Sequence, residues 1–369
     1  MANKAFKYRI YPNSEQEIQL AKTFGCARFV YNKCLEEHER RYADGEPFSS
    51  RTAMNNYCNH VLKENFAFLK EVDKFSLTNA IYHLDEGYKR MFRHEGGHPK
   101  FKSKHKSRRS YTTNMTNNNI KVLDKAVQLP KLGKVKAVVH RSIPDDYIIK
   151  SATISQEKDG SYYVSILCEF DVAIPVANGT NAVGLDYKSD GLYVSSDGEI
   201  ADMPHYYRES QPKLAKEQRK LKHKVKGSNN WKKQQLRIAK THRHTANKRK
   251  DYLHKKSTEI ANQYDVVCVE NLNMRSMSNK GFGNGKATLD NGYGMFLGML
   301  ECKLNDRGKT LVKVDKWYPS SQLCSCCGHQ QPMPLRERIY RCLNCGNVMD
   351  RDANAAINIL NEGLKILSA

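Results

Sequence analysis

Two pairs of closely spaced cysteines near the end of the chain constrain its fold more than any other feature. Each pair has two residues between its members, and fourteen residues separate the pairs. Such spacing lets both thiolates of a pair face one tetrahedral ion, and the glycine behind each pair permits a tight turn. The gap is one residue short of the usual ~15 to 20, and Cys326 is a rival ligand. The pattern predicts a closed, structural zinc site with four thiolate ligands: Cys324, Cys327, Cys342 and Cys345.

The chain is strongly basic. Its 369 residues carry 61 Lys and Arg against 39 Asp and Glu, a net charge of +22. Between Arg208 and Lys256, 18 basic residues stand against three acidic ones, a net charge of +15. A charge this one-sided is typical of a surface that binds phosphate backbones, with disorder as the alternative. We therefore expect a nucleic-acid partner, and a merely soluble basic protein is the competing interpretation.

Composition also bears on the compartment. The longest apolar stretch, residues 293–300, falls far short of the ~18 residues that a membrane span needs and contains two glycines. Residues 1–12 interleave basic and aromatic side chains without an apolar signal core. Five of the eleven cysteines fall between Cys324 and Cys345, which favours metal binding over disulfide pairing. We therefore expect a cytoplasmic protein of two or three domains with no membrane contact.

Hydrophobic periodicity predicts helices in the first quarter of the chain. A short N-terminal strand precedes a helix that opens with a capping box of Ser14 and Glu17 and is interrupted near Gly25. Two further helical blocks cover residues 51–63 and 76–92. Because strands both precede and follow these blocks, we expect one β-barrel-like domain with a helical insertion.

Strands dominate the next segment. Residues 151–155 and 161–170 predict a hairpin that turns at Asp159-Gly160. A domain boundary is expected near residues 174–181, where small and turn-forming residues precede a new strand at 182–186. The basic stretch that follows is expected to be one long helical segment. The fold class predicted is therefore α+β with several domains.

Three acidic residues occupy positions that would suit a nuclease. Asp186 ends the strand at 182–186, Glu270 ends the apolar run 266–269, and Asp352 precedes a helix starting near Asn354. Adjacent parallel strand ends and the start of a packed helix can bring such carboxylates within a few ångströms of one another. A carboxylate cluster can hold two divalent cations. Such ions activate a water molecule and stabilise the leaving oxygen in phosphodiester hydrolysis. Each acid alone also fits a helix cap or a solvated strand end, and it is their order that favours a site.

Together these segments resemble a known family. Four segments of this chain resemble, in order, the split RuvC-like nuclease motifs of the transposon-encoded TnpB (OrfB) family: Gly184–Asp186, Val269–Leu272, the cysteine quartet and Asp350–Ala356. That family is related to small type V CRISPR effectors. The resemblance covers nearly the whole chain, including residues 4–12, 99–102 and 318–322.

The resemblance implies an RNA-guided endonuclease that cuts double-stranded DNA with Mg²⁺. The guide RNA would come from the transposon end, and a short transposon-adjacent motif would flank the target. Asp186, Glu270 and Asp352 would be the catalytic metal ligands. Asp352 is favoured over Asp350 because the family's acid stands two residues before the asparagine of the next helix. Many relatives have glycine where this chain has Lys188, which puts the local turn in doubt.

The family's architecture would divide the chain into four parts. These are a wedge β-barrel (1–12 and 97–176), a helical recognition insert (13–96), an RNase H-like RuvC α/β domain (181–319 and 349–369) and an inserted zinc ribbon (320–348).

Nucleic-acid contacts fall into two expected groups. Phosphate contacts are expected from the two basic runs, among them Lys100, Lys102, Lys220, Lys222 and Lys224. Contacts to the transposon-adjacent motif are carried over from relatives, and ordinary packing explains each position equally well: Lys74, Thr78, Asn79, Tyr111 and Thr112.

Two other functions remain open from the sequence. A guide-directed DNA-binding repressor, or regulator of transposition, would be marked by loss of one nuclease acid, and all three are present. A strand-transfer transposase could also use three acids and metal, but its acids need not flank a zinc ribbon. The nuclease is therefore the leading hypothesis.

Overall fold

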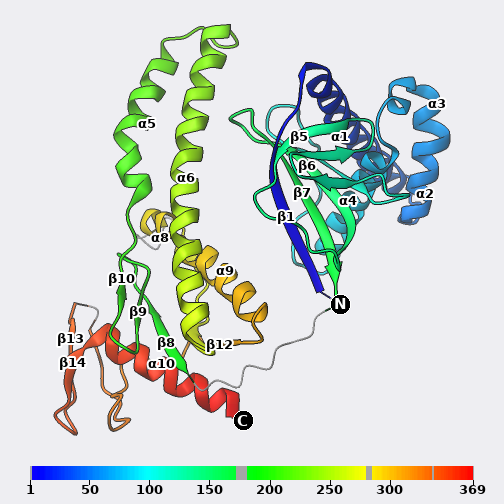
Figure 1. Ribbon diagram of the computed structural model, residues 1–369. Helices are drawn as coiled ribbons and strands as arrows, with labels where there is room; N and C mark the ends of the chain where they lie inside the picture. Colours follow the sequence, from blue (N-terminus) through cyan, green and yellow to red (C-terminus); the bar gives the residue numbers. More distant parts are fainter. Residues whose placement is uncertain (1, 172–180, 280–284, 335, 369) are drawn as a thin grey trace. The chain divides into compact units, whose positions relative to one another are not determined.

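The computed structural model describes residues 2–171, 181–279, 285–334 and 336–368, and the chain forms two compact units, residues 1–172 and 173–369 (Figure 1). The boundary expected near residues 174–181 lies almost entirely outside the described residues. No described helix is both long enough and apolar enough to cross a bilayer.

Unit 1 is built on a seven-stranded antiparallel sheet with the order β2-β6-β7-β1-β5-β4-β3. Its strands are β1 (Ala2–Tyr11), β2 (Arg109–Asn114), β3 (Lys121–Leu123), β4 (Ala126–Leu129), β5 (Gly133–Val138), β6 (Ile148–Gln156) and β7 (Tyr162–Phe170). The predicted hairpin is confirmed, because β6 and β7 pair antiparallel around Gly160, whose φ is +83°. Among the described strands β2 and β3 form the two edges, so hydrogen bonds do not close this sheet into the expected barrel.

Helices cover one face of this sheet. They are α1 (Ser14–Ala43), α2 (Arg51–Asn56), the π-helix η1 (Tyr57–Leu62), α3 (Lys63–Asn65), the 3₁₀ helix η2 (Ala67–Lys70) and α4 (Lys74–Phe92). Alternate residues of β1, namely Phe6, Tyr8 and Ile10, are buried, as the period of a half-buried strand requires. The Phe24 ring on α1 packs against Tyr111 of β2, with ring centroids 5.7 Å apart.

The start of α1 differs from the expectation by one residue. The capping box is formed by Asn13 and Gln16, since the Gln16 amide donates to Asn13 Oδ1 at 2.8 Å and the Asn13 amide donates to Gln16 Oε1 at 3.1 Å. The extended backbone of Asn13 makes it the cap, which leaves Ser14 inside the first turn. The expected interruption is also absent, because α1 runs through Gly25.

Unit 2 contains a five-stranded mixed sheet with the order β10-β9-β8-β11-β12. Its strands are β8 (Ala182–Tyr187), β9 (Tyr193–Ser195), β10 (Ile200–Ala201), β11 (Val266–Glu270) and β12 (Thr310–Val314). Strands β8, β11 and β12 are parallel, whereas β9 pairs antiparallel with β8. The other elements of the unit are α5 (Tyr206–Lys222), α6 (Asn229–Gln263), α7 (Met274–Met277), α8 (Gly285–Asn291), α9 (Tyr293–Asn305), β13 (Ile339–Arg341), β14 (Val348–Asp350) and α10 (Arg351–Ser368).

The long basic segment is a pair of helices and not the single stretch expected. Helices α5 and α6 pack together and are joined around Gly227, whose φ is +87°, with Ser228 capping α6. The buried Gln234 amide fastens the pair by donating to the Glu217 carbonyl at 3.0 Å and to its carboxylate at 2.6 Å. The pair forms the elongated hairpin seen in Figure 1.

Glycines set the distance between α10 and the sheet. A Cβ on Gly184 of β8 would clash with the Ala356 carbonyl oxygen and lie 2.8 Å from the Leu360 nitrogen. A Cβ on Gly363 would clash in the same way with the Cys268 side chain of β11. The helix backbone therefore lies directly on β8, which brings its first turn to the end of that strand.

Candidate active site and zinc centre

The structure places the three predicted acids at one edge of the mixed sheet. Asp186 lies near the end of β8, and Glu270 is the last residue of β11. The two strands run parallel with Leu185 opposite Val269, so their next residues emerge at the same edge. Asp352 lies in the first turn of α10, the helix that packs on β8.

Burial and neighbouring carboxylates shift the ionisation of Asp186. Burial raises the pKa of Asp186 well above its usual range, and the charges of Asp352 and Glu270 raise it further, against an opposing effect of Arg351. Burial also raises the pKa of Glu270, to about 7. Carboxylates held together out of water repel one another when ionised, and a divalent cation relieves that repulsion. The donor set is therefore suited to Mg²⁺.

Asp352 is the third acid of this group, and Asp350 has a different role. The Asp350 carboxylate caps α10, accepting hydrogen bonds from the Asp352 amide at 2.9 Å and the Ala353 amide at 3.0 Å. The helix consequently begins at Arg351, three residues before the expected start. The Asp352 carboxylate accepts a hydrogen bond from Arg351 Nη2 at 2.8 Å and lies 3.8 Å from Arg338 Nη1.

The carboxylates are spread more widely than the thiolates. In the described part of the chain, only the cysteine quartet has three or more ligand atoms that all lie within 4.8 Å of one another. Ligands around two cations that are 3.5–4 Å apart need not converge on a single point. The spacing of the acids is thus compatible with a site that holds two metal cations.

The four predicted cysteines meet as a zinc site requires. The sulfurs of Cys324 and Cys345 are 3.7 Å apart, and those of Cys327 and Cys342 are 3.6 Å apart. A tetrahedron with Zn–S bonds of ~2.3 Å has sulfurs about 3.8 Å apart, so the quartet fits zinc without rearrangement. Cys326, the rival ligand, is exposed and outside the group.

Both cysteine pairs adopt the same turn. Gly328 and Gly346 each have a φ of +73°, and their amides donate to the carbonyls of Cys324 and Cys342, respectively. Such a positive φ favours glycine, which explains its place behind each pair. The His329 amide and the Asn344 side chain donate toward the Cys327 sulfur and lower its pKa to about 6. These two donors thus favour the thiolate form of Cys327, the form that a metal ion requires.

Two buried asparagines tie the cysteine ribbon, the segment that carries the four cysteines, to α10. Asn354 donates to the Leu323 carbonyl at 2.7 Å and accepts from the Ser325 amide at 2.9 Å. Asn358, one turn later, donates to the carbonyls of Ser320 and Leu323, both at 2.8 Å. This role was not predicted from the sequence, although two asparagines spaced by four residues share one face of the helix and are a signal for it.

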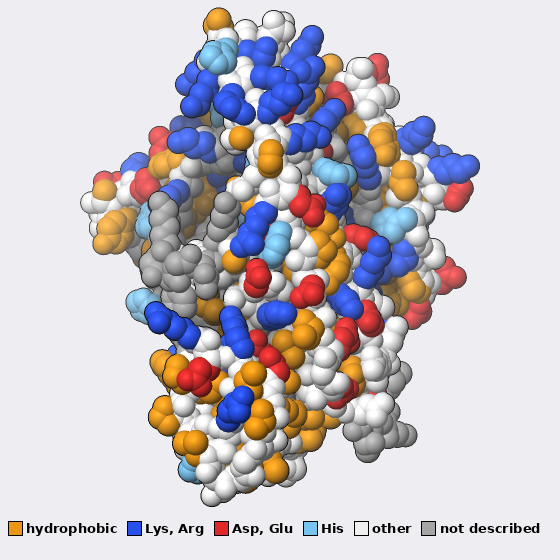
Figure 2. All heavy atoms as spheres, turned by 90° about the vertical axis from the view of Figure 1, so that its left-hand side faces the viewer, with side chains coloured by type: hydrophobic (Ala, Val, Ile, Leu, Met, Phe, Trp, Pro, Cys, Tyr) orange, Lys and Arg blue, Asp and Glu red, His pale blue; other side chains and the backbone are white. Residues whose placement is uncertain are grey.

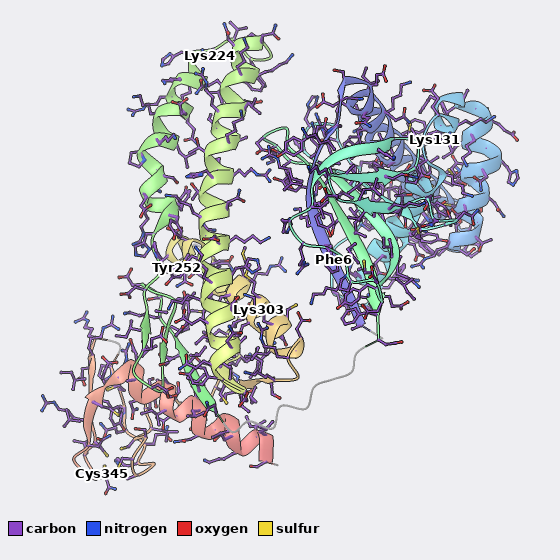
Figure 3. All side chains as sticks on the ribbon, in the orientation of Figure 1. Phe6, Lys131, Lys224, Tyr252, Lys303 and Cys345 are labelled. Carbon is purple, nitrogen blue, oxygen red and sulfur yellow. The ribbon has the colours of Figure 1, made fainter. Side chains whose placement is uncertain are left out.

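The basic hairpin projects from the sheet at the opposite end of unit 2 from the ribbon (Figure 3). Lys and Arg side chains crowd its far end, at the top of the view in Figure 2. Lys220 and Lys222 are exposed there and Lys224 is half-buried, and of the three only Lys220 has a recorded acidic partner, Glu217 at 3.0 Å. These lysines therefore lie where they can reach a phosphate backbone.

The other predicted nucleic-acid contacts have different environments in unit 1. Lys74 and Lys100 are exposed and Thr78 is half-buried. Asn79 bridges α4 to β2 by donating to the Thr112 carbonyl at 3.0 Å, and the Thr112 hydroxyl bonds that of Thr153 at 2.8 Å.

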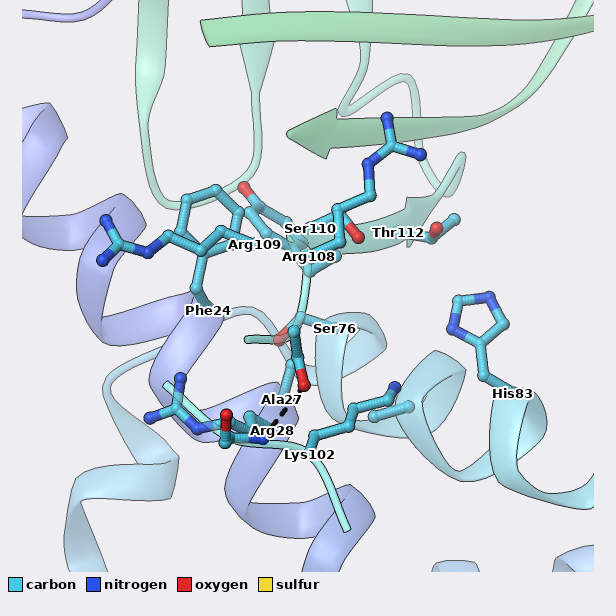
Figure 4. Close-up of a pocket in the computed structure, with 14 residues that line it drawn as sticks. Phe24, Ala27, Arg28, Ser76, His83, Lys102, Arg108, Arg109, Ser110 and Thr112 are labelled. Carbon is cyan, nitrogen blue, oxygen red and sulfur yellow. Dashed lines mark hydrogen bonds between the residues drawn. The ribbon is translucent and has the colours of Figure 1, made fainter. Parts of the chain in front are cut away.

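Tyr111 is a core residue. Its side chain is 4 % exposed, and burial raises its pKa above the usual range. The alternation of β2 turns this ring toward Phe24 of α1 (Figure 4), which accounts for its burial.

The turn after Asp186 forms despite the missing glycine. The Gly191 amide donates to the Lys188 carbonyl at 3.2 Å, and the Asn291 side chain donates to the same oxygen at 3.1 Å. Lys188 Nζ lies 3.4 Å from Asp202. Lys188 therefore fits the turn that joins β8 to β9.

Three family profiles match the chain. "Probable transposase", of the IS605 OrfB type, matches residues 165–280; "Cas12f1-like, TNB domain" matches residues 293–359; and "Helix-turn-helix domain" matches residues 1–47. A solved chain described as "Cryo-EM structure of the Cas12f1-sgRNA-target DNA complex" has a TM-score of 0.60 and 14% identity. That match covers 98% of this chain and 99% of the other, and it shows a shared α+β fold.

Curated relatives match at higher identity. A protein of Streptomyces pristinaespiralis named "Putative RNA-guided DNA endonuclease" is 36% identical, over 98% of this chain and 89% of that protein. A second, "Putative RNA-guided DNA endonuclease InsQ" of Escherichia coli K12, is 29% identical over 99% and 93% of the two chains. With its OrfB profile and a relative this similar along nearly its whole length, the chain belongs to the TnpB (OrfB) family.

Proposed function

We propose that this protein is an RNA-guided endonuclease that cuts double-stranded DNA by Mg²⁺-dependent hydrolysis of phosphodiesters. The observation that carries the proposal is the placement of Asp186, Glu270 and Asp352 at one sheet edge, where burial and then the charges of the other two acids raise the pKa of Asp186. The names of the two curated relatives support the same activity. The guide RNA is proposed to derive from the transposon end, with a transposon-adjacent motif beside the target.

Each acid has a role in this proposal. Asp186, Glu270 and Asp352 would hold the cations, and bound cations would supply the chemistry that activates a water and stabilises the leaving oxygen. Arg351 contacts the Asp352 carboxylate at 2.8 Å and fixes its orientation in the first turn of α10. Because α10 rests on Gly184, the distance between Asp352 and Asp186 is fixed by backbone packing and not by a flexible loop.

The remaining parts bind and position nucleic acid in this scheme. The sheet of unit 1 is proposed to be the wedge, and its helices α1 to α4 the recognition insert. The five-stranded sheet, whose three parallel strands are flanked by an antiparallel pair, is proposed to be the RuvC-like domain, with the cysteine ribbon inserted before α10. Lys220, Lys222 and Lys224 would hold the guide–target heteroduplex through its phosphates.

The test is cleavage of a plasmid that carries a matched target, with the cognate RNA. Asp186→Ala should abolish cleavage and leave RNA-guided binding intact, because base pairing and the phosphate contacts lie elsewhere. Ca²⁺ should support binding and support cutting poorly, because its longer and looser coordination positions the attacking water badly. Glu301→Gln, which changes a half-buried acid on α9 that pairs with Lys313, is the control and should cut like the wild type.

Two outcomes would contradict the proposal. If the wild type binds the matched target in Mg²⁺ and leaves it uncut, the protein is a guide-directed repressor or a regulator of transposition. If Asp186→Ala cuts at the wild-type rate, the active site lies elsewhere.

A further inference from the structure

Trp317 is unusual because a tryptophan is rarely left in solvent. Its side chain is 80 % exposed, and the chain has one other tryptophan, Trp231, which is half-buried. Tryptophan is highly buried on average, and it is enriched on surfaces that bind a partner. Trp317 has no role in the nuclease scheme above, so its exposure calls for a ligand.

The backbone of Trp317 lies close to the sheet edge that carries the acids. Strands β11 and β12 run parallel with Glu270 opposite Val314, and the Asn271 amide donates to the Val314 carbonyl at 2.9 Å. Trp317 follows Val314 by three residues, so its Cα lies at most roughly 16 Å from that of Glu270. The chain therefore leaves β12 at the edge where a bound strand would be cut.

A turn fixes the backbone of Trp317. The Trp317 amide donates to the Asp315 carboxylate at 2.8 Å, and the Tyr318 amide donates to the Asp315 carbonyl at 3.1 Å. Tyr318 is half-buried and packs against the apolar cluster formed by β11, β12 and α10. The Ser320 carbonyl then accepts a hydrogen bond from Asn358 of α10 at 2.8 Å. The turn is thus held by the sheet and by the helix that carries the third acid, while the ring of Trp317 stays in solvent.

The surroundings of the ring suit an unpaired base. The exposed Lys316 ammonium lies 4.9 Å from the centroid of the Trp317 ring. Proteins that bind single strands combine aromatic rings, on which bases stack, with cations that follow the phosphates. A base inside a duplex is already stacked and paired, whereas pairing of a guide RNA with one DNA strand displaces the other and leaves its bases unpaired.

We propose that Trp317 stacks on an unpaired base of the DNA strand that enters the acid site, and thereby sets which phosphodiester faces the acids. The inference rests on the proposed function, because that reaction supplies the single strand. Stacking needs only the flat face of a base, so Trp317 should act without base preference. Its role is to place the strand, whereas Asp186, Glu270 and Asp352 hold the cations.

Intrinsic fluorescence tests the contact directly, because Trp231→Phe leaves Trp317 as the only tryptophan. The RNA-loaded Trp231→Phe chain is titrated with single-stranded oligothymidylate and with a non-matching duplex of the same length, in Ca²⁺ to suppress cutting. Anisotropy of a label on the DNA records binding in the same sample. The single strand should quench the fluorescence as it binds, and the duplex should bind with little quenching.

Variants of Trp317 separate stacking from apolar contact. Trp317→Phe keeps a ring, Trp317→Leu keeps only apolar volume, and Ile200→Ala removes an exposed apolar side chain from the opposite edge of the same sheet as the matched control. Trp317→Leu should bind the single strand about five-fold or more weakly, while Trp317→Phe and Ile200→Ala should bind nearly as tightly as the wild type. In Mg²⁺, Trp317→Leu should cut a matched plasmid over a wider range of positions than the wild type.

Two results would overturn the inference. One is binding of the single strand to Trp231→Phe without quenching, or with no more quenching than the duplex gives. The other is a Trp317→Leu variant whose affinity and cut positions match those of Ile200→Ala. The contact is measured without cleavage, so the two proposals fail separately. If the wild type binds its target uncut, the nuclease fails and quenching still supports the contact; if the wild type cuts and no quenching occurs, only the contact fails.

Discussion

At the scale of single residues, the folded protein contains charged side chains whose environment costs free energy. Lys102 is half-buried next to Tyr31 and has no carboxylate partner within the described part of the chain, and Asp186 lies beside two like charges. Neither arrangement favours the folded chain alone, because burying an unpaired charge and crowding carboxylates both cost free energy. Both arrangements become favourable when an ion of opposite charge binds.

Lys102 should make stability depend on pH in the alkaline range. Its pKa is about 8 in the folded chain against a usual value of 10.5, so the unfolded chain holds the extra proton between these values. Stability contributed by this site should therefore be lowest below pH 8 and rise as pH increases toward 10.5. Lys102→Met should raise the unfolding midpoint at about pH 7, and its advantage over the wild type should shrink by about pH 10. Thermal unfolding at both pH values checks this, and an equal difference at both would contradict it.

At the scale of elements, α10 links three parts of unit 2. Its first turn carries Asp352, its middle rests on Gly184, and its Asn354 and Asn358 hold the segment that enters the cysteine ribbon. The ribbon and the acids are therefore mechanically connected. Loss of a metal ion from the cysteines should therefore alter the position of Asp352 through this helix.

Zinc removal tests that connection. Cys342→Ser should lower metal content and stability together, because ligand binding at such a site is folding energy. Asn354→Ala should retain zinc and still lower the cleavage rate, since it frees the ribbon from α10 without touching a thiolate. Elemental analysis of purified, folded protein checks the first effect, and well under one zinc per chain in the wild type would refute the site.

The basic hairpin of α5 and α6 should bind the phosphates of nucleic acids without sequence preference. Changing Lys220, Lys222 and Lys224 together to Gln should weaken binding to every sequence and reduce the salt slope by roughly one unit for each phosphate contact that the change removes. The same change at Lys121, Lys125 and Lys136 of unit 1 is a control that removes an equal charge. A slope unaffected by the hairpin variant would mean that these lysines are only solvated.

At the scale of the whole molecule, the sequence was informative where a local pattern determines the structure. The cysteine spacing predicts a site whose sulfurs meet within 4.8 Å, and the alternation in β1 predicts its buried face. Positions that depend on tertiary packing were not predictable in this way. The burial of Tyr111 follows from which face of β2 lies under α1, and that cannot be read from a six-residue strand.

Local signals were also missed. Gly227 and Ser228 mark the turn that divides the basic segment, but its continuous charge suggested one helix. Asp350 caps α10, so the helix begins before the apolar positions from which its start was predicted. The role of Gly184 depends on the approach of α10, a contact between segments that are far apart in sequence. Cap identity and close backbone approach are set by three-dimensional context, which periodicity does not contain.

The central claim is that Asp352 joins Asp186 and Glu270 in one metal site, and neighbouring carboxylates in the same turn allow a direct test. Asparagine is a good helix cap, so Asp350→Asn should preserve α10, whereas Asp352→Asn removes a charged ligand. The measurement is the single-turnover rate of cleavage of a matched plasmid in Mg²⁺, with RNA-guided binding measured in parallel. The account predicts that Asp350→Asn cuts at close to the wild-type rate and that Asp352→Asn binds the target but does not cut it. Cleavage by Asp352→Asn at the wild-type rate, or its loss in Asp350→Asn alone, would contradict the account.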